Sequence, residues 1–135
     1  MLYAVIENLY TVIEFINEEL EARDCDPHEQ TQIAIAVEEI FTNIAHYAYS
    51  PYTGEVLVQV SIGKELLIIF EDQGKPYNPL MQAEPDITLS IDERSIGGLG
   101  VYMVKNIMDT VDYNYYDQKN VLTMRKSLSK CKNIY

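Results

Sequence analysis

The sequence predicts an α+β fold: a two-layer sandwich in which a mainly antiparallel sheet carries helices on one face. Apolar residues recur every three or four positions in segments 9–23, 27–48 and 98–109, which indicates three helices. Strand-like runs joined by short turns fill 55–72 and 110–128, which indicates two hairpins. The order helix, helix, hairpin, helix, hairpin favours helices packed on an antiparallel sheet over helices placed between parallel strands.

The first two helices are marked by their starts as well as by their periodicity. Asn8 is a candidate N-cap for the first helix. In the second helix Asp26 is the expected N-cap, Pro27 takes the first helical position, and Glu29 completes a capping box. We expect this helix to run to Ala48. One apolar stripe of the first helix should be buried: Leu9, Val12, Ile13, Ile16 and Leu20.

The first hairpin joins two unlike strands. Residues 55–62, "EVLVQVSI", alternate apolar and polar side chains, and a turn at Gly63 and Lys64 leads into 65–72, "ELLIIFED". The unbroken apolar run of the second strand predicts burial on both of its faces. Residues 75–96 contain three prolines and little periodicity. An irregular segment of that length is often a lid over a site.

Composition restricts the kind of protein. The chain has 135 residues, so we expect one domain spanning 1–135. No stretch approaches the roughly 20 apolar residues of a membrane helix, and no leader pattern is seen, so a cytoplasmic location without membrane association is expected. The net charge of −11 argues against binding nucleic acid through its phosphates and serves either solubility or a basic partner. Cys25 and Cys131 lack metal or redox spacing and are expected to be free thiols.

A polar pair lies beside the apolar face of the second helix. Glu39 and Asn43 are one turn apart and therefore stack on each other, whereas Glu38 points elsewhere. The carboxylate can act as a base or orient water, and the amide oxygen can ligate a hard cation such as Mg²⁺. The alternative is a solvated pair that only stabilises the helix.

Two glycine-containing stretches can form the rest of a site. "DQGKPYN", residues 72–78, places a carboxylate at the tip of an apolar strand and follows it with turn-forming residues. "GGLG", residues 97–100, opens the third helix, where free backbone N–H groups favour phosphate. A simple tight turn is the alternative for the second stretch. Neither the Rossmann nor the P-loop glycine pattern is present.

Together these stretches resemble a known family. "EEIFTNIAHYAY", "FEDQGKPYNP" and "GGLGVYMVKNIMD" are similar to the N, G1 and G2 boxes of the GHKL ATPase superfamily, which groups histidine kinases, type II topoisomerases and certain chaperones. The resemblance covers nearly the whole chain and implies the Bergerat ATP-binding fold. The small size and the D-x-G-x-P form of the second box look most like the anti-sigma-factor serine/threonine protein kinases of bacteria.

The resemblance implies roles for the polar residues. Asn43 would ligate the Mg²⁺ that bridges the triphosphate of ATP, and Glu39 would be the general base. Asp72 would accept a hydrogen bond from the adenine amino group, and Gly74 would let the backbone approach the base. Pro76 stands where many family members have a second glycine, which stiffens the turn.

Further residues are implied at the two ends of the nucleotide. The glycines Gly97, Gly98 and Gly100, with Leu99, would cradle the phosphates through backbone N–H groups. Arg94 is a candidate for the terminal phosphate, or else an ordinary surface arginine. Thr123 would be an adenine-side residue, because the Gly-Thr pair that commonly opens the last strand in the family is replaced here by "KNVLTMRK".

The leading functional hypothesis is an ATP-binding anti-sigma regulatory factor. It would phosphorylate a serine or threonine of a small anti-anti-sigma partner, or sequester a sigma factor, and the resemblance allows a homodimer. The alternative is a nucleotide-dependent binding module that sequesters a regulator without significant kinase activity. A stand-alone histidine-kinase catalytic module is less favoured, because no phosphoacceptor helix is seen and His46 is better explained as a residue that lines or packs the site.

Overall fold

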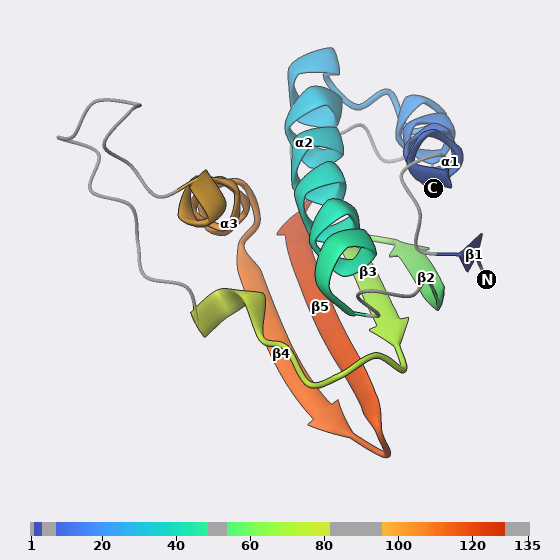
Figure 1. Ribbon diagram of the computed structural model, residues 1–135. Coiled ribbons are helices and arrows are strands. Elements are labelled where there is room, and N and C mark those ends of the chain that lie inside the picture. The colour runs from blue at the N-terminus through green and yellow to red at the C-terminus, as the bar shows by residue number, and fades with distance from the viewer. Residues whose placement is uncertain (1, 4–7, 49–53, 82–95, 129–135) are drawn as a thin grey trace, which may run out of the picture.

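A five-stranded antiparallel sheet forms one layer of the molecule, and three helices lie on one of its faces (Figure 1). The computed structural model describes residues 2–3, 8–48, 54–81 and 96–128. The strands, in the sheet order β1-β2-β3-β5-β4, are β1 (Leu2–Tyr3), β2 (Glu55–Ile62), β3 (Glu65–Asp72), β5 (Lys119–Ser127) and β4 (Thr110–Tyr116). The helices are α1 (Leu9–Glu21), α2 (Pro27–Asn43) and α3 (Ile96–Ile107). The predicted α+β sandwich is confirmed.

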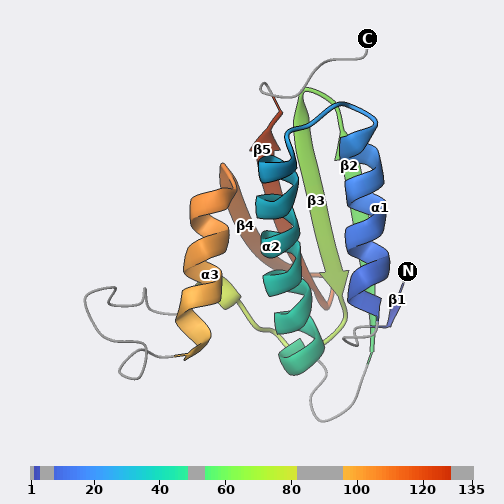
Figure 2. The same cartoon turned by 90° about the horizontal axis from the view of Figure 1, so that it is seen from above.

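The core lies between the sheet and the three helices, all of which contribute buried side chains to it, and the helices lie over the same face of the sheet (Figure 2). Side chains alternate between the two faces of a strand, so Leu66, Ile68 and Phe70 of β3 all point toward the helices and are almost fully buried. The side chains between them are only half-buried. The prediction that β3 is buried on both faces is therefore wrong, since none of the described helices covers the second face. The fully buried residues of α2 are Ile33, Ala36, Val37, Ile40 and Phe41.

The start of α2 partly follows the prediction. The Asp26 side chain accepts a hydrogen bond of 3.0 Å from the backbone N–H of His28, and Pro27 occupies the first helical position. Glu29 does not complete a capping box; its carboxylate instead pairs with Lys126 Nζ at 3.5 Å. In α1 the side chain of Asn8 makes no capping hydrogen bond, so that expected cap is also wrong.

The end of α2 changes its winding. After Asn43 the chain continues as a π-helix, Ile44–Ala48, so helical structure does reach the predicted end. Short π-helical turns within helices are often found at functional sites. Here the change of winding comes directly after one of the residues singled out in the sequence.

The sheet register brings the end of β3 beside the start of β5. β3 pairs with β5 so that Asp72 lies opposite Asn120. The β4–β5 hairpin turns through Asp117 and Gln118, with φ of 51° and 60°, the left-handed values of a tight two-residue hairpin. Two residues 48 positions apart in the sequence thus become neighbours at one edge of the molecule.

The structure bears on three further features: the cysteines, the irregular segment 75–96 and membrane-spanning helices. Cys25 is buried and disulfide-bonded, so the expectation of two free thiols is wrong; Cys131 lies outside the described residues. Of the irregular segment 75–96, the described part includes a 3₁₀ turn, Pro79–Met81, and residues 82–95 lie outside the described part. No helix within the described ranges is both long and apolar enough to cross a membrane.

Candidate functional site

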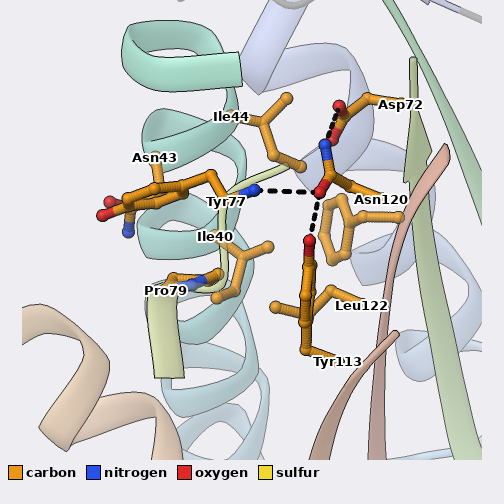
Figure 3. Close-up of a pocket in the computed structure, with 10 residues that line it drawn as sticks. Ile40, Asn43, Ile44, Asp72, Tyr77, Pro79, Tyr113, Asn120 and Leu122 are labelled. Carbon is orange, nitrogen blue, oxygen red and sulfur yellow. Dashed lines mark hydrogen bonds between the residues drawn. The ribbon is translucent and has the colours of Figure 1, made fainter. Parts of the chain in front are cut away.

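A pocket opens between the last turn of α2 and the ends of β3 and β5 (Figure 3). Most of its wall is apolar, with a few polar groups that converge on it, which is the usual make-up of a small-molecule site. Asn43 and Asp72, predicted from two separate motifs, line the same pocket. The lining residues are Ile40, Asn43, Ile44, Phe70, Asp72, Tyr77, Pro79, Tyr113, Asn120 and Leu122.

Asp72 is a buried carboxylate whose direction is fixed. It is 4% exposed, and its Oδ1 accepts hydrogen bonds of 2.9 Å from the Gly74 N–H and from Asn120 Nδ2. Burial raises the pKa of Asp72, while the hydrogen bonds from Asn120 and Gly74 partly oppose that rise. Within the described residues no hydrogen bond reaches Oδ2. This second oxygen is therefore the one that can accept a hydrogen bond from a ligand.

Asn120 is the hydrogen-bonding centre of the pocket floor, and the sequence analysis missed it. Besides Asp72, its amide nitrogen donates to the carbonyl oxygens of Lys75 at 2.9 Å and Gly74 at 3.3 Å. Its amide oxygen accepts from the Tyr77 N–H at 3.1 Å and from the Tyr113 hydroxyl. Figure 3 shows the contacts to Asp72, Tyr77 and Tyr113.

A sequence signal for Asn120 did exist. The inward positions of β5 are Asn120, Leu122 and Met124, so an amide stands in a row of core residues. A buried amide needs partners, and such a position is therefore a candidate for a site.

Asn43 presents an oxygen to the pocket. Its Nδ2 donates to the backbone oxygen of Glu39 at 2.9 Å. Because a carbonyl can only accept, the amide must turn its nitrogen toward the helix, which leaves Oδ1 for a ligand. An amide oxygen is a ligand that Mg²⁺ accepts. No cluster of three or more His, Cys, Asp or Glu suited to a metal occurs in the described part of the chain.

Glu39 faces α3 across a very short gap. A Cβ added to Gly100 would overlap Glu39 Oε2, so any other residue at this position would push the carboxylate out of its present place. The pKa of Glu39 is raised, first by burial and then by the neighbouring charge of Glu38. A raised pKa brings a carboxylate closer to the range in which it can exchange protons near neutral pH.

The glycines of the third motif lie in the first turns of α3. The helix begins at Ile96, and the first four N–H groups of a helix have no partner within it. The backbone N–H groups of Gly97 and Gly98 belong to these four, whereas Leu99 and Gly100 follow them. Since Gly100 also touches Glu39, the start of α3 lies next to the polar stripe of α2.

Tyr77 lines the pocket, and a second tyrosine, Tyr47, packs against its ring. The rings of Tyr47, in the π-helix, and Tyr77, in the turn after β3, lie 5.4 Å apart. His46 is exposed and meets the Tyr47 ring edge-on, so it packs beside the pocket without lining it.

Two of the remaining predicted site residues, Pro76 and Thr123, do not line the pocket. Pro76 is exposed and does not line the pocket. Thr123 alternates with the buried Leu122 and Met124 and so lies on the opposite face of β5, away from the pocket. Arg94 lies outside the described residues.

Comparison with known proteins places this geometry in a family. The sequence pattern of the family described as "Histidine kinase-like ATPase domain" matches residues 2–126. The chain therefore belongs to the histidine kinase-like ATPase domain family. Solved structures of a mycobacterial sensor histidine kinase, MprB, and of the Acinetobacter baumannii histidine kinase AdeS share the fold, with TM-scores of 0.53 and 0.54. They are 17% and 14% identical in sequence, each over 93% of this chain, and the match covers 97% of MprB and 66% of AdeS.

Curated relatives belong to a narrower group. The serine-protein kinase RsbW of Bacillus licheniformis is 34% identical over 106 residues, which cover 73% of this chain and 64% of the relative. The anti-sigma F factor of Clostridium kluyveri is 30% identical over 100 residues, which cover 73% of this chain and 70% of the relative. The chain is thus related to the anti-sigma-factor serine kinases, and it spans about two thirds of their length.

Proposed function

We propose that this protein is an ATP-dependent serine/threonine protein kinase that regulates a sigma factor through a small anti-anti-sigma partner. The observation that carries the proposal is the convergence of Asn43 and Asp72 on one pocket, with Glu39 one turn away against the start of α3. The names of the curated relatives, serine-protein kinase and anti-sigma F factor, support the same activity.

The adenine end of ATP fits the pocket floor. The free oxygen of Asp72, Oδ2, would accept a hydrogen bond from the amino group of adenine. Guanine carries a carbonyl at that position and would meet the carboxylate with like polarity, so the site would select adenine. The apolar side chains of Ile40, Ile44 and Leu122 would cover the faces and edges of the base.

The phosphate end fits the junction of α2 and α3. Oδ1 of Asn43 would ligate Mg²⁺, which neutralises charge on the triphosphate when it is bound. The N–H groups of Gly97 and Gly98, which have no partner within the helix, would donate to phosphate oxygens at its positive end, and Leu99 and Gly100 remain candidates beside them. Arg94 remains a candidate for the terminal phosphate.

Glu39 would supply the proton acceptor. Its carboxylate would take the proton of the partner's serine hydroxyl as that oxygen bonds to the γ-phosphorus, and the bond to the leaving ADP breaks. Its half-buried place beside Gly100 holds the carboxylate next to the start of α3, where the phosphates would lie.

The proposal also includes the partner proteins, the cellular location and the oligomeric state. The partner would be an anti-anti-sigma protein, with a sigma factor as the regulated target, and the reaction would take place in the cytoplasm. A homodimer is a further expectation, which sedimentation of the purified chain tests directly.

Phosphoryl transfer is tested with labelled ATP. The chain is incubated with Mg²⁺, labelled ATP and a candidate anti-anti-sigma protein, and label on the partner is measured for the wild type, Glu39→Ala and the matched control Glu38→Ala. We expect transfer by the wild type and the control, and a rate about 10²–10⁴-fold lower for Glu39→Ala, because the base is gone. ATP binding without transfer to any partner tried would instead favour a nucleotide-dependent binding module.

A further inference from the structure

Asn120 is hydrogen-bonded on both sides of its amide group, and one of these bonds holds the carboxylate proposed to read adenine. It is 5% exposed, it lies opposite Asp72 in the sheet, and it lines the pocket. We propose that Asn120 is a positioning residue that sets the nucleobase specificity of the site by holding one oxygen of Asp72 and leaving the other to face the base. This inference rests on the proposed function.

The orientation of the Asn120 amide is fixed by its partners. The Asp72 carboxylate and the carbonyls of Gly74 and Lys75 can only accept hydrogen bonds, so they must face the amide nitrogen. The Tyr77 N–H can only donate, so it must face the amide oxygen. A flipped amide would place like groups against each other on both sides and is excluded.

Because the amide is fixed, the two oxygens of the Asp72 carboxylate have different roles. Oδ1 of Asp72 accepts from both Asn120 and the Gly74 N–H, at 2.9 Å each. These two donors hold Oδ1 in the floor and determine the rotation of the carboxylate. Oδ2 is then the oxygen left for a base with an amino group, and Asp72 lines the pocket in which that base would dock.

Asn120 also joins the turn to the sheet. Its contacts reach three successive parts of the chain after β3, the carbonyls of Gly74 and Lys75 and the N–H of Tyr77. From the other side, the Tyr113 hydroxyl of β4 donates to its amide oxygen. The amide thereby sets the distance between the carboxylate and the Tyr77 side of the pocket.

A positioning role and a purely structural role predict different binding data. If Asn120 only stabilised the turn, its removal would weaken every nucleotide by the same factor. If it aims Asp72, its removal weakens nucleotides that offer an amino group to Asp72 more than those that do not. A nucleotide without that amino group isolates this difference.

The test compares ATP with purine riboside triphosphate, which lacks the adenine amino group. Equilibrium binding of both is measured by calorimetry, with Mg²⁺ present, for the wild type, Asn120→Ala and the control Asn114→Ala. Asn114 lies on β4 opposite Val121, on the face away from the pocket. We expect the wild type and the control to prefer ATP by about tenfold or more, the value of one hydrogen bond to a charged group. In Asn120→Ala the preference should fall below about threefold.

A milder variant keeps the test valid if Asn120→Ala does not fold. Tyr113→Phe removes only the hydroxyl that holds the Asn120 amide, and the ring still packs. Its preference for ATP should fall to a value between those of the wild type and Asn120→Ala. Equal weakening of both nucleotides in either variant, or an unchanged preference, would overturn the positioning role. Failure of the wild type to bind ATP at all would overturn the proposed function, and this inference with it.

Discussion

Single residues of α2 owe their chemistry to what surrounds them. Glu38 and Glu39 are adjacent in sequence, yet Glu38 is exposed while Glu39 is half-buried against Gly100. Burial, and then the charge of Glu38, raise the pKa of Glu39. The difference between two identical side chains is therefore set by the helix face on which each lies.

The raised pKa of Glu39 predicts the pH dependence of phosphoryl transfer. A base must be deprotonated, so kcat/KM should rise as the pH increases through the pKa of Glu39, which lies above the ordinary value of 4.5. Glu38→Gln removes the second cause of the rise, and the acidic limb should move to lower pH. A pH profile of kcat/KM for both proteins measures this, and an identical limb in the variant would contradict the role of Glu39 as base.

The same shift has a consequence for stability with a defined sign. Because the folded state raises the pKa of Glu39, it binds the proton more tightly than the unfolded state does. Any stability from this group is present at low pH and is lost as the pH rises through the raised pKa. The folded structure thus disfavours the charged form of this carboxylate relative to the unfolded chain.

At the scale of elements, Lys126 joins α2, α3 and β5 at the end of the sheet away from the pocket. Its Nζ lies 3.5 Å from Glu29 Oε1 and donates to the Ile107 carbonyl at 2.9 Å. The side chains of Lys126 and Glu29 are only 14% and 11% exposed. By contrast, Lys119 pairs with Glu71 at 2.9 Å while its side chain is 37% exposed.

These two pairs predict unequal costs of removing a lysine. Lys126→Met leaves the carboxylate of Glu29 buried without a cation and should lower the free energy of unfolding by about 3 kcal/mol. Lys119→Met removes an exposed pair and should cost about 0–1 kcal/mol. Urea denaturation measures both. Adding Glu29→Gln to Lys126→Met should recover part of the loss, and equal losses in the two lysine variants would contradict this account.

The elements themselves could be predicted because their signals are local. Periodicity and the Asp26–Pro27 start defined α2, and the turn residues defined both hairpins. The predicted capping box at Glu29 was wrong because the same sequence pattern also allows a buried ion pair. The ion pair needs Lys126 nearby, and only the packed fold supplies it.

The site could be predicted only in part, for the same reason. Asn43 and Asp72 carry recognisable motifs, but Asn120 gains its role from the β3–β5 register, which no local pattern sets. Thr123 has the residue type expected from the family, but the alternation of β5 turns it to the other face. The same alternation places Asn120 on the inward face.

At the scale of the whole molecule, the two faces of the sheet differ in burial. One face carries the helices (Figures 1 and 2). The core lies on the same face, and the pocket lies where the end of α2 meets the ends of β3 and β5. The other face is half-exposed along β3 and β5. The net charge of −11 is consistent with a basic surface on a partner protein, although solubility alone would also be served.

The most direct test of the central claim, an adenine-nucleotide site at this pocket, is an NMR titration of the labelled chain with ATP and Mg²⁺. We expect saturable shifts of the side-chain amides of Asn43 and Asn120 and of the backbone amide of Gly74. The side-chain amides of Gln59 and Asn114, on the other face of the sheet, should stay in place. No saturable shift, or shifts confined to Gln59 and Asn114, would contradict the account.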